Sequence, residues 1–508
     1  MSAILSTQDA DDHHEHIEEA PQTAEVRLDK AEDPRQWSRV RKHLYTWIIS
    51  IMPANLAYAS SIYTAVIPSI MDGYDCSRVV ATLGMTTFMI GFATGPLLFA
   101  PMSEMWGRKQ VFRVTLGLVL AFTLGCALSP NIVALCIFRF LVGFFGAPTV
   151  TNAGGSVTDL WPPSHRSVPL AIFTAGSFIP PVLAPVVGGF IVEYASSSWS
   201  AMQWTWWSNL IFGGVVYVLI IFLPETYGPK LLRDKARRMA SSSSPSSGHG
   251  TLVSSVPSSP SLTEYLIENL TRPWMMLCTE PIVFLFSLYM AFVFGILYLD
   301  FTAYPIVYHD TRGWSPGIAG LSFLGMALGM TIATILSPYV NTIHAYYVLK
   351  LGEKQQQQQS SPNNTNKSSA TPPEARLPHL IILSWFIPLS LFWFGWTAAP
   401  PAHYLASIAS GVPFGIGLIA LFLGINSYLT DCYGPFAASA LAATAVFRAA
   451  FGAVFPLFAQ KLYAALGVHW AMTLLGALAV LLAPLPWAFY RFGPAIRRRS
   501  AYHVKTFE

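Results

Sequence analysis

The sequence Ala100-Pro-Met-Ser-Glu-Met-Trp-Gly-Arg-Lys109 is a short cationic turn between two long apolar stretches of the chain. Similar apolar stretches recur along the rest of the sequence, with polar residues between them. A bilayer core of about 30 Å requires about 20 apolar residues per helix, and these stretches have that length. We therefore expect twelve transmembrane helices, at residues 45–68, 79–102, 110–130, 132–153, 168–192, 204–224, 280–306, 317–340, 378–398, 403–429, 434–462 and 468–490.

The overall composition also indicates a membrane protein. Hydrophobic residues make up 53% of the 508 residues and charged residues only 11%, against roughly 25% charged residues in an ordinary soluble domain. Such a chain requires lipid as its solvent, so we expect an all-α membrane protein embedded in a lipid bilayer.

The positions of the cations predict the orientation. Cytoplasmic loops are enriched in Lys and Arg. With both termini cytoplasmic, 25 of the 30 Lys and Arg residues fall on the inner side, and only Arg78, Arg312 and Lys461 fall on the outer side. We therefore attribute the net charge of +4 to the orientation of the chain in the membrane, and we expect no nucleic-acid partner.

Polar segments divide the chain into parts. We expect a disordered cytoplasmic N-tail at 1–44, an N-terminal six-helix bundle at 45–225, a flexible Ser-rich cytoplasmic linker at 226–277, a C-terminal six-helix bundle at 278–490 that contains a low-complexity loop at 341–377, and a basic cytoplasmic C-tail at 491–508. We interpret the run Arg497-Arg498-Arg499 as an anchor to anionic lipid.

The sequence gives no sign of a leader or of a metal site. The N-tail is acidic and has no apolar core before the first span, so we expect no cleavable signal peptide. The cluster His13, His14 and His16 lacks a second set of ligands, and the five cysteines are scattered. We expect no metal and no cofactor.

Several motifs together resemble the major facilitator superfamily and, more narrowly, the fungal branch of its twelve-span drug:proton antiporters. The resemblance runs from residue 34 to residue 491. It rests on Gly95-Pro-Leu-Leu-Phe-Ala-Pro-Met-Ser-Glu-Met-Trp-Gly-Arg-Lys, Arg139-Phe-Leu-Val-Gly-Phe-Phe-Gly, Thr151-Asn-Ala-Gly-Gly, Leu223-Pro-Glu-Thr-Tyr-Gly-Pro-Lys-Leu-Leu, Glu280-Pro-Ile-Val, and Ser439-Ala-Leu-Ala-Ala with Arg448. The resemblance implies two six-helix bundles that rock around a site near the midplane.

The cationic turn is similar to the signature loop of that superfamily. Gly107, Arg108 and Lys109 match it, whereas Glu104 stands where the family prefers Asp. The resemblance implies a cytoplasmic latch in which the carboxylate meets a helix N-terminus of the other bundle, an arrangement that the helix dipole favours. The alternative is that the two cations only determine topology.

Three ionisable residues lie within expected spans. The resemblance gives Arg139 a role in proton coupling and Arg448 a role in the cavity or in gating, and structural roles are the alternative for both. Asp300 does not match the family pattern. An intramembrane carboxylate is a proton or cation site by default, so we interpret Asp300 as a coupling residue that holds Arg139 or Arg448, with an interfacial Asp as the alternative.

The fifth span resembles the signature of drug antiporters, with Pro185, Gly188 and Gly189 as matching residues that bend the helix or allow close packing. Pro180 and Ala184 stand where that family usually has Gly. Aromatic residues make up 14% of the chain. As the lining of a cavity for ring-containing amphipathic molecules we expect Tyr63, Phe178, Trp204, Tyr298 and Phe414.

The expected function is export of amphipathic small molecules, such as drugs or secondary metabolites, by a monomer in exchange for protons. The alternatives are an importer of a nutrient or polyamine and, more remotely, a membrane sensor that transports nothing. The sequence shows no Walker loop and no hydrolase motif in a usable context, so we expect no enzyme. Its expected location is the plasma membrane, with the vacuolar membrane as the alternative.

Overall fold

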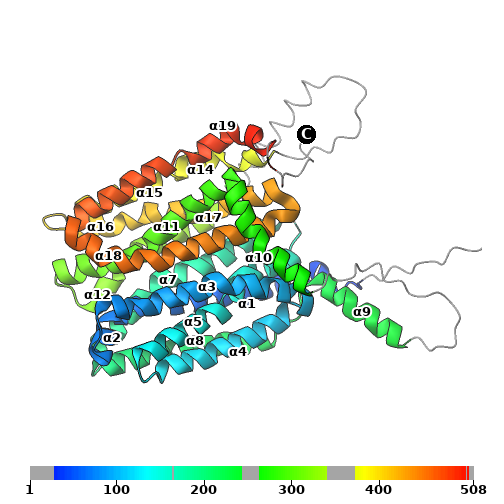
Figure 1. Ribbon diagram of the computed structural model, residues 1–508, viewed down its shortest axis with the longest axis horizontal. Helices are drawn as coiled ribbons and strands as arrows, with labels where there is room; N and C mark the ends of the chain where they lie inside the picture. Colours follow the sequence, from blue (N-terminus) through cyan, green and yellow to red (C-terminus); the bar gives the residue numbers. More distant parts are fainter. Residues whose placement is uncertain are drawn as a thin grey trace, which may run out of the picture.

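The computed structural model describes residues 28–162, 165–242, 262–339, 372–498, 500 and 502. Within these ranges the chain forms helices and turns and contains no strand. Most helices lie side by side along one direction, and α9 (Gly228–Ser242) and α10 (Leu262–Thr279) lie at one end of them (Figure 1). We name this end the linker end, and the other the opposite end.

The first half of the chain contains six spans. Their helices are α1 (Arg39–Ser61) with α2 (Ile67–Tyr74), α3 (Arg78–Trp106), α4 (Arg108–Ala127), α5 (Ile132–Gly146) with α6 (Pro148–Leu160), α7 (Ser167–Tyr194) and α8 (Ser198–Ile221). A short 3-10 helix, Ile62–Val66, joins α1 to α2. Prolines inside α3 and α7 leave each of these as one helix.

The second half begins with α11 (Pro281–Pro305), which continues as the π-helix Ile306–Thr311. The span that starts with α12 (Pro316–Leu321) extends to Tyr339. Then follow α14 (Pro378–Leu383), α15 (Phe386–Thr397), α16 (Tyr404–Ala409), α17 (Gly411–Tyr433), α18 (Ala437–Leu482) and α19 (Leu485–Arg497).

Gly467 divides α18 into two spans. Its φ of 70° and ψ of 167° are not helical, and a positive φ suits glycine because it has no Cβ. The break lies between the expected spans 434–462 and 468–490. Among the described residues, nine helical segments are long and apolar enough to cross a bilayer, and the last of them, Tyr404–Arg497, contains three expected spans.

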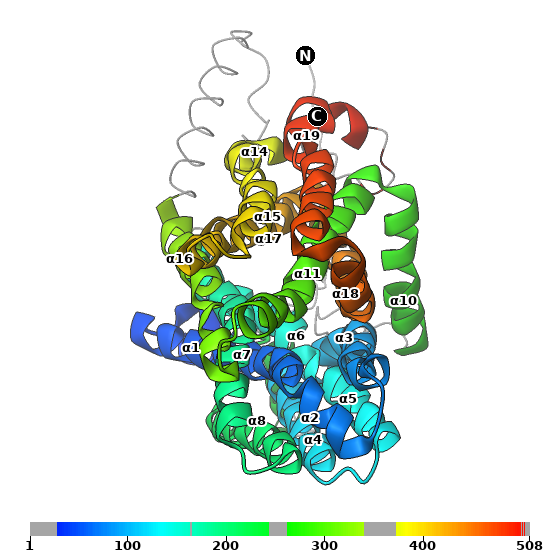
Figure 2. The same cartoon turned by 90° about the vertical axis from the view of Figure 1, so that its left-hand side faces the viewer.

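The helices form two groups. Seen from the opposite end, α1 to α8 lie in one group and α11 to α19 in the other, with α3 and α7 facing the second group (Figure 2). The most extensive contacts between the groups join α18 to α3 and α12 to α7. The expected fold class, an all-α protein of two six-helix bundles, is confirmed.

The ends of the bundles contain more helix than the sequence analysis expected. The expected N-tail reached residue 44, but α1 begins at Arg39, because the Ser38 side chain accepts a hydrogen bond from the Arg41 amide and caps the helix. The linker, expected to be flexible, contains α9 and α10. The centre of the linker and most of the loop 341–377 lie outside the described residues.

The segment before α1 contacts α9. The ammonium group of Lys235 lies 3.0 Å from a carboxylate oxygen of Asp29 and 2.9 Å from one of Glu32. The hydrogen bond from Lys235 lowers the pKa of Glu32. Because the start of the described chain and the linker meet here, both lie at the linker end.

The C-terminal helix is fixed to its bundle by a buried ion pair. Arg497 donates to both carboxylate oxygens of Glu374, at 2.9 and 2.8 Å. The prediction that Arg497 contacts lipid is wrong, because its position on α19 turns the side chain toward the bundle. Arg498 is exposed, and Arg499 lies outside the described residues.

This pair leads to a prediction about stability. Arg497→Leu should lower the free energy of unfolding by about 3 kcal/mol, because it leaves the Glu374 carboxylate buried without its cation. Thermal unfolding of the purified full-length chain in detergent measures the effect. Arg498→Leu removes an exposed cation one position further and is the matched control. Equal melting temperatures for the two variants would show that the pair does not hold α19.

Candidate functional site

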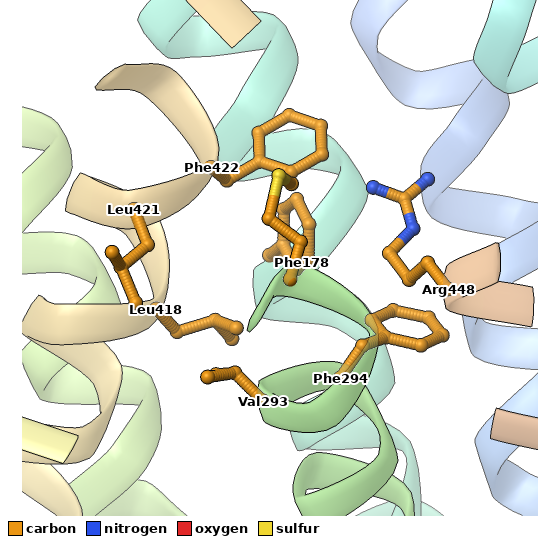
Figure 3. A pocket seen from close by; sticks show the side chains of 8 residues that line it. Phe178, Val293, Phe294, Leu418, Leu421, Phe422 and Arg448 are labelled. Atoms are coloured by element: carbon orange, nitrogen blue, oxygen red, sulfur yellow. The ribbon is translucent and has the colours of Figure 1, made fainter. Parts of the chain in front are cut away.

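The described residues line a partly open recess between the two bundles (Figure 3). The space in it outside protein atoms is about 220 Å³ and includes open solvent. Phe178 of α7 contributes from the first bundle, and the second bundle contributes residues of α11, α17 and α18. The lining residues are Phe178, Met290, Val293, Phe294, Leu418, Leu421, Phe422 and Arg448. Phe178 and Phe422 meet across the recess with ring centroids 4.6 Å apart. The recess is thus apolar, aromatic and shared by both bundles.

Arg448 is the charged residue of this lining. Its side chain lies among the aromatic residues of the recess (Figure 3), and the residue is 7% exposed. Its guanidinium carbon lies 5.1 Å from the ring centroids of both Phe294 and Phe422. Its Nε has no hydrogen-bond partner within the described parts of the chain. Aromatic ring faces attract a cation, so these rings hold the guanidinium beside the recess.

Arg139 is buried elsewhere, inside the first bundle. It is completely buried, and it donates to the backbone oxygens of Gly84 at 3.1 Å and Ala59 at 2.8 Å. Rings of Tyr63 and Phe88 lie 4.8 and 4.4 Å from its guanidinium carbon. These contacts match the structural alternative for Arg139. A role in proton coupling stays a prediction.

Asp300 lies in the half of α11 that is near the opposite end and is 4% exposed. Within the described ranges it forms no hydrogen bond or ion pair, so the pair with Arg139 or Arg448 that we expected is not formed here. The aromatic residues within electrostatic reach of its carboxylate are Tyr304 and Tyr463. The near-complete burial also disagrees with the interfacial alternative.

The cationic turn is held together by a carboxylate that the sequence analysis did not select. Glu225 accepts hydrogen bonds from the amides of Arg108 at 3.0 Å and Lys109 at 3.3 Å, and so caps the N-terminus of α4. Its Oε1 also accepts from the amides of Thr226 and Tyr227, both at 3.0 Å. Glu225 belongs to the motif Leu223-Pro-Glu-Thr-Tyr, but nothing in the sequence paired that motif with the turn.

The turn also contacts other residues of the first bundle and α9. The Arg108 side chain lies 3.5 Å from Asp159 of α6 and donates to Ser103 at 2.6 Å. Arg233 of α9 donates to the backbone oxygen of Glu104 at 2.6 Å. At Gly107, with φ of 93°, a Cβ would lie 2.2 Å from Glu225, so the turn requires glycine. A latch between Glu104 and the other bundle stays a prediction.

Hydrogen bonds between the bundles lie away from the linker end. Ser60 and Tyr298 share a hydrogen bond of 2.5 Å between α1 and α11. Thr86 of α3 donates to the backbone oxygen of Ala453 in α18 at 2.9 Å. The amide of Gly317, at the start of α12, donates to Glu193 near the end of α7 at 2.9 Å. In the structure, these bonds close the opposite end.

Two of the selected residues of α7, Pro185 and Gly189, take part in this closure, whereas Gly188 packs within its own bundle. A Cβ on Gly189 would lie 2.4 Å from the backbone oxygen of Pro316, and one on Gly188 would lie 2.7 Å from Ala65. On α12, a Cβ on Gly320 would lie 2.8 Å from the backbone oxygen of Pro185. Small residues therefore allow α7 and α12 to approach backbone to backbone. A role of these residues in bending α7 stays a prediction.

The residues expected to line a cavity lie in different places. Phe178 lines the recess, Tyr298 lies between the bundles, Tyr63 packs on Arg139, and Phe414 is buried in α17. Trp204 does not line the recess. It is 57% exposed, because Trp206, two positions later on α8, faces the core and turns Trp204 outward.

Phe294 and Phe422 were missed by the sequence analysis. Leu418, Leu421 and Phe422 have the spacing of one helix face, but many other apolar residues in the spans have the same spacing.

The chain is similar to one protein family over most of its length. The sequence model of the Major Facilitator Superfamily matches residues 49–456. The "Major facilitator superfamily multidrug transporter mdrA" of Aspergillus fumigatus is 39% identical over 477 residues, covering 93% of this chain and 74% of the relative. The "MFS-type efflux pump MFS2" of Trichophyton rubrum is 41% identical over 471 residues, covering 92% and 75%. The "Ascochitine biosynthesis cluster MFS transporter" of Didymella fabae is 36% identical over 481 residues, covering 94% and 88%.

Solved structures share the fold. A structure of the proton:xylose symporter XylE superposes with a TM-score of 0.61 at 15% sequence identity, covering 89% of this chain and 97% of the symporter. A partially occluded inward open structure of XylE from E. coli gives a TM-score of 0.59 at 17% identity, covering 88% and 97%.

The capping role of Glu225 can be tested by substitution. Glu225→Ala should lower the free energy of unfolding by about 1 to 2 kcal/mol, because the amides of Arg108 and Lys109 lose their acceptor. Glu225→Gln keeps an acceptor oxygen without the charge and should lose less. Chemical unfolding of the purified chain in detergent ranks the three proteins. The cap assignment fails if the alanine variant is as stable as the parent.

Proposed function

The chain belongs to the Major Facilitator Superfamily, and from this premise we propose that it exports amphipathic, ring-containing small molecules across a membrane by alternating access. The observation that carries this proposal is the apolar aromatic recess on the seam between the two bundles, in which Phe178 and Phe422 come from different bundles. A molecule bound there touches both moving parts. The chain would bind and release its substrate chemically unchanged and so act as a transporter and not as an enzyme.

The similar fungal proteins support export as the direction. Two of them are named a multidrug transporter and an efflux pump, and a third is a transporter of a biosynthesis cluster. We place this multi-pass protein in the plasma membrane, with the linker end and both termini in the cytoplasm, as the distribution of Lys and Arg favours.

Export itself is tested with the full-length chain in vesicles. Purified protein in proteoliposomes, and expression in a drug-sensitive host that lacks its own efflux pumps, should both move fluorescent ring-containing compounds away from the cytoplasmic face. Net movement toward that face would identify an importer instead, and no movement of any compound would favour the sensor alternative.

The hydrogen bonds between the two bundles support alternating access. The bonds Ser60–Tyr298, Thr86–Ala453 and Glu193–Gly317 lie away from the linker end. With the linker end in the cytoplasm, the structure corresponds to a state that is closed toward the outside. We propose that these bonds and the close approach of α7 to α12 form the outer gate. Opening it would require the two helices to separate.

The outer gate predicts a glycine requirement. Gly189→Leu should abolish transport in proteoliposomes, because its side chain would enter the space of Pro316 and prevent closure. The control is Gly214→Leu on α8, because a Cβ at Gly214 meets no atom within 4 Å. Both variants should reach the membrane in normal amounts. Equal transport by the two variants would show that the close approach of α7 to α12 does not form the outer gate.

We also propose that export is coupled to protons through Asp300. A charged side chain in the hydrocarbon zone is costly unless it has a partner, and Asp300 is 4% exposed. Gain or loss of a proton there would change the free-energy difference between conformations that bury the carboxylate and conformations that expose it to water. Tyr304 and Tyr463 interact electrostatically with Asp300, so a change in its charge would alter this interaction energy.

Asp300→Asn tests this coupling. The variant should lose transport driven by a pH gradient, because it can no longer exchange a proton, and should keep substrate exchange at equal pH on both sides. Flux measured with and without the gradient separates these effects. Asp310→Asn, at an exposed position near the end of the same span and outside the recess lining, is the control. Full gradient dependence in Asp300→Asn would mean that another group carries the proton.

A further inference from the structure

We propose that Arg448 makes the recess selective for organic acids, that is, for a carboxylate on an apolar, ring-containing body. This inference rests on the proposed transport function and specifies the substrate class of the same site.

The first step is the unbalanced charge of Arg448. In the part of the chain that the structure describes, Arg448 has no carboxylate within ion-pair distance, and its Nε has no hydrogen-bond partner. Asp300 does not pair with it, as shown above. A buried cation without a counter-ion is costly. The rings of Phe294 and Phe422 offset part of this cost, but they accept no hydrogen bond of ordinary strength.

Arg139 also has one buried nitrogen, Nη2, without a hydrogen-bond partner among the described residues, but its surroundings differ from those of Arg448. Arg139 donates to two backbone oxygens, at 3.1 and 2.8 Å. The bonded groups of Arg139 lie inside the first bundle, whereas Arg448 lines a recess. A ligand can therefore reach the group that still needs an acceptor.

The second step is the match between a guanidinium and a carboxylate. The planar guanidinium offers parallel N–H donors that suit two carboxylate oxygens. Two ring faces, each 5.1 Å from the guanidinium carbon, limit its rotation and keep its orientation before binding. A ligand carboxylate would neutralise the cation and accept its hydrogen bonds at once.

The third step is the rest of the lining. Phe178, Met290, Leu418 and Leu421 present only apolar side-chain surface to the recess. A ring body packs favourably there, whereas a second charge would find no partner among them. In this conformation the recess is much smaller than drug-sized sites of ~300 to 1,000 Å³, so a ring-containing acid would require the lining residues to move apart.

Position on the seam gives the acid a role in the transport cycle. Arg448 belongs to the second bundle, and Phe178 to the first. An acid held by Arg448 with its ring against Phe178 would connect the bundles.

Three probes with one ring system test the charge preference: 2-naphthoic acid, its methyl ester, and 2-naphthylmethylamine. Binding to the full-length chain in lipid nanodiscs is measured by equilibrium dialysis with naphthalene fluorescence. The parent protein should bind the acid about tenfold more tightly than the ester or the amine, as expected for a charge-assisted hydrogen-bonded pair. Equal binding of the three probes, or no binding of any, overturns the proposal.

The variants separate Arg448 from general charge effects. Arg448→Gln should reduce the acid-to-ester ratio to about one, because the glutamine amide cannot neutralise a carboxylate. Arg448→Lys keeps the charge without the planar fork and should give an intermediate ratio. Lys461→Gln removes an exposed cation from the same helix α18 and should keep the parent ratio. An unchanged ratio in Arg448→Gln overturns the proposal.

A fallback variant and a parallel measurement of export complete the test. Should Arg448→Gln not yield folded protein, the ratio of Arg448→Lys against that of the parent decides, and equality of these two ratios counts against a bidentate pair. Export of the acid, the ester and the amine from proteoliposomes is measured in parallel. If both are exported without preference for the acid, the inference fails while the proposed transport function stands.

Discussion

The absence of water from the bilayer core is the constraint on which the rest of the structure depends. Every backbone N–H and C=O in that zone must find a partner within the protein, and helices satisfy this locally. Side-chain hydroxyls follow the same rule. Thr115 and Thr123 of α4 donate to backbone oxygens of their own helix, at 2.8 and 2.7 Å. A polar group that does not find such a partner is therefore informative about function.

Arg139 and Arg448, two of the buried arginines, show how one constraint is met in two ways. Arg139 uses backbone oxygens from α1 and α3, so its charge joins three helices of one bundle and stabilises the packing between them. Arg448 has aromatic rings as neighbours and lies beside a recess. In the sequence both are single cations within apolar spans, and their spacing does not distinguish them. The difference arises from which neighbouring helix each one faces.

Helix positions could be predicted from the sequence much better than helix rotation. Apolar length and polar interruptions located the spans, and the interruption before residue 468 corresponds to the non-helical Gly467. Rotation is harder because lipid is as apolar as the protein interior, so hydropathy does not separate the two faces of a span. Trp204 and Trp206 are the same residue type, two positions apart, and one is 57% exposed while the other is buried.

Sequence also gives little information on pairs that depend on three-dimensional contact. Glu225 and the cationic turn are separated by more than a hundred residues, and only the return of α8 beside α4 brings the carboxylate to the amides of Arg108 and Lys109. Likewise, the expected partner of Asp300 was chosen by depth alone. Equal depth places two residues in one plane, but their helices must also face each other for the side chains to meet.

The seam between the bundles has a strength that suits repeated opening. Its polar part consists of a few hydrogen bonds, such as Ser60–Tyr298, Thr86–Ala453 and Glu193–Gly317, and such bonds in a membrane contribute about 0.6 kcal/mol each. Their sum, about 2 kcal/mol, is close to the ~2.3 kcal/mol gained when one elementary charge crosses 100 mV. Glycine contacts add dispersion energy without interlocking side chains, so α7 and α12 can separate without repacking. The proposed coupling to one proton would therefore supply a free energy comparable with that of the polar part of the seam.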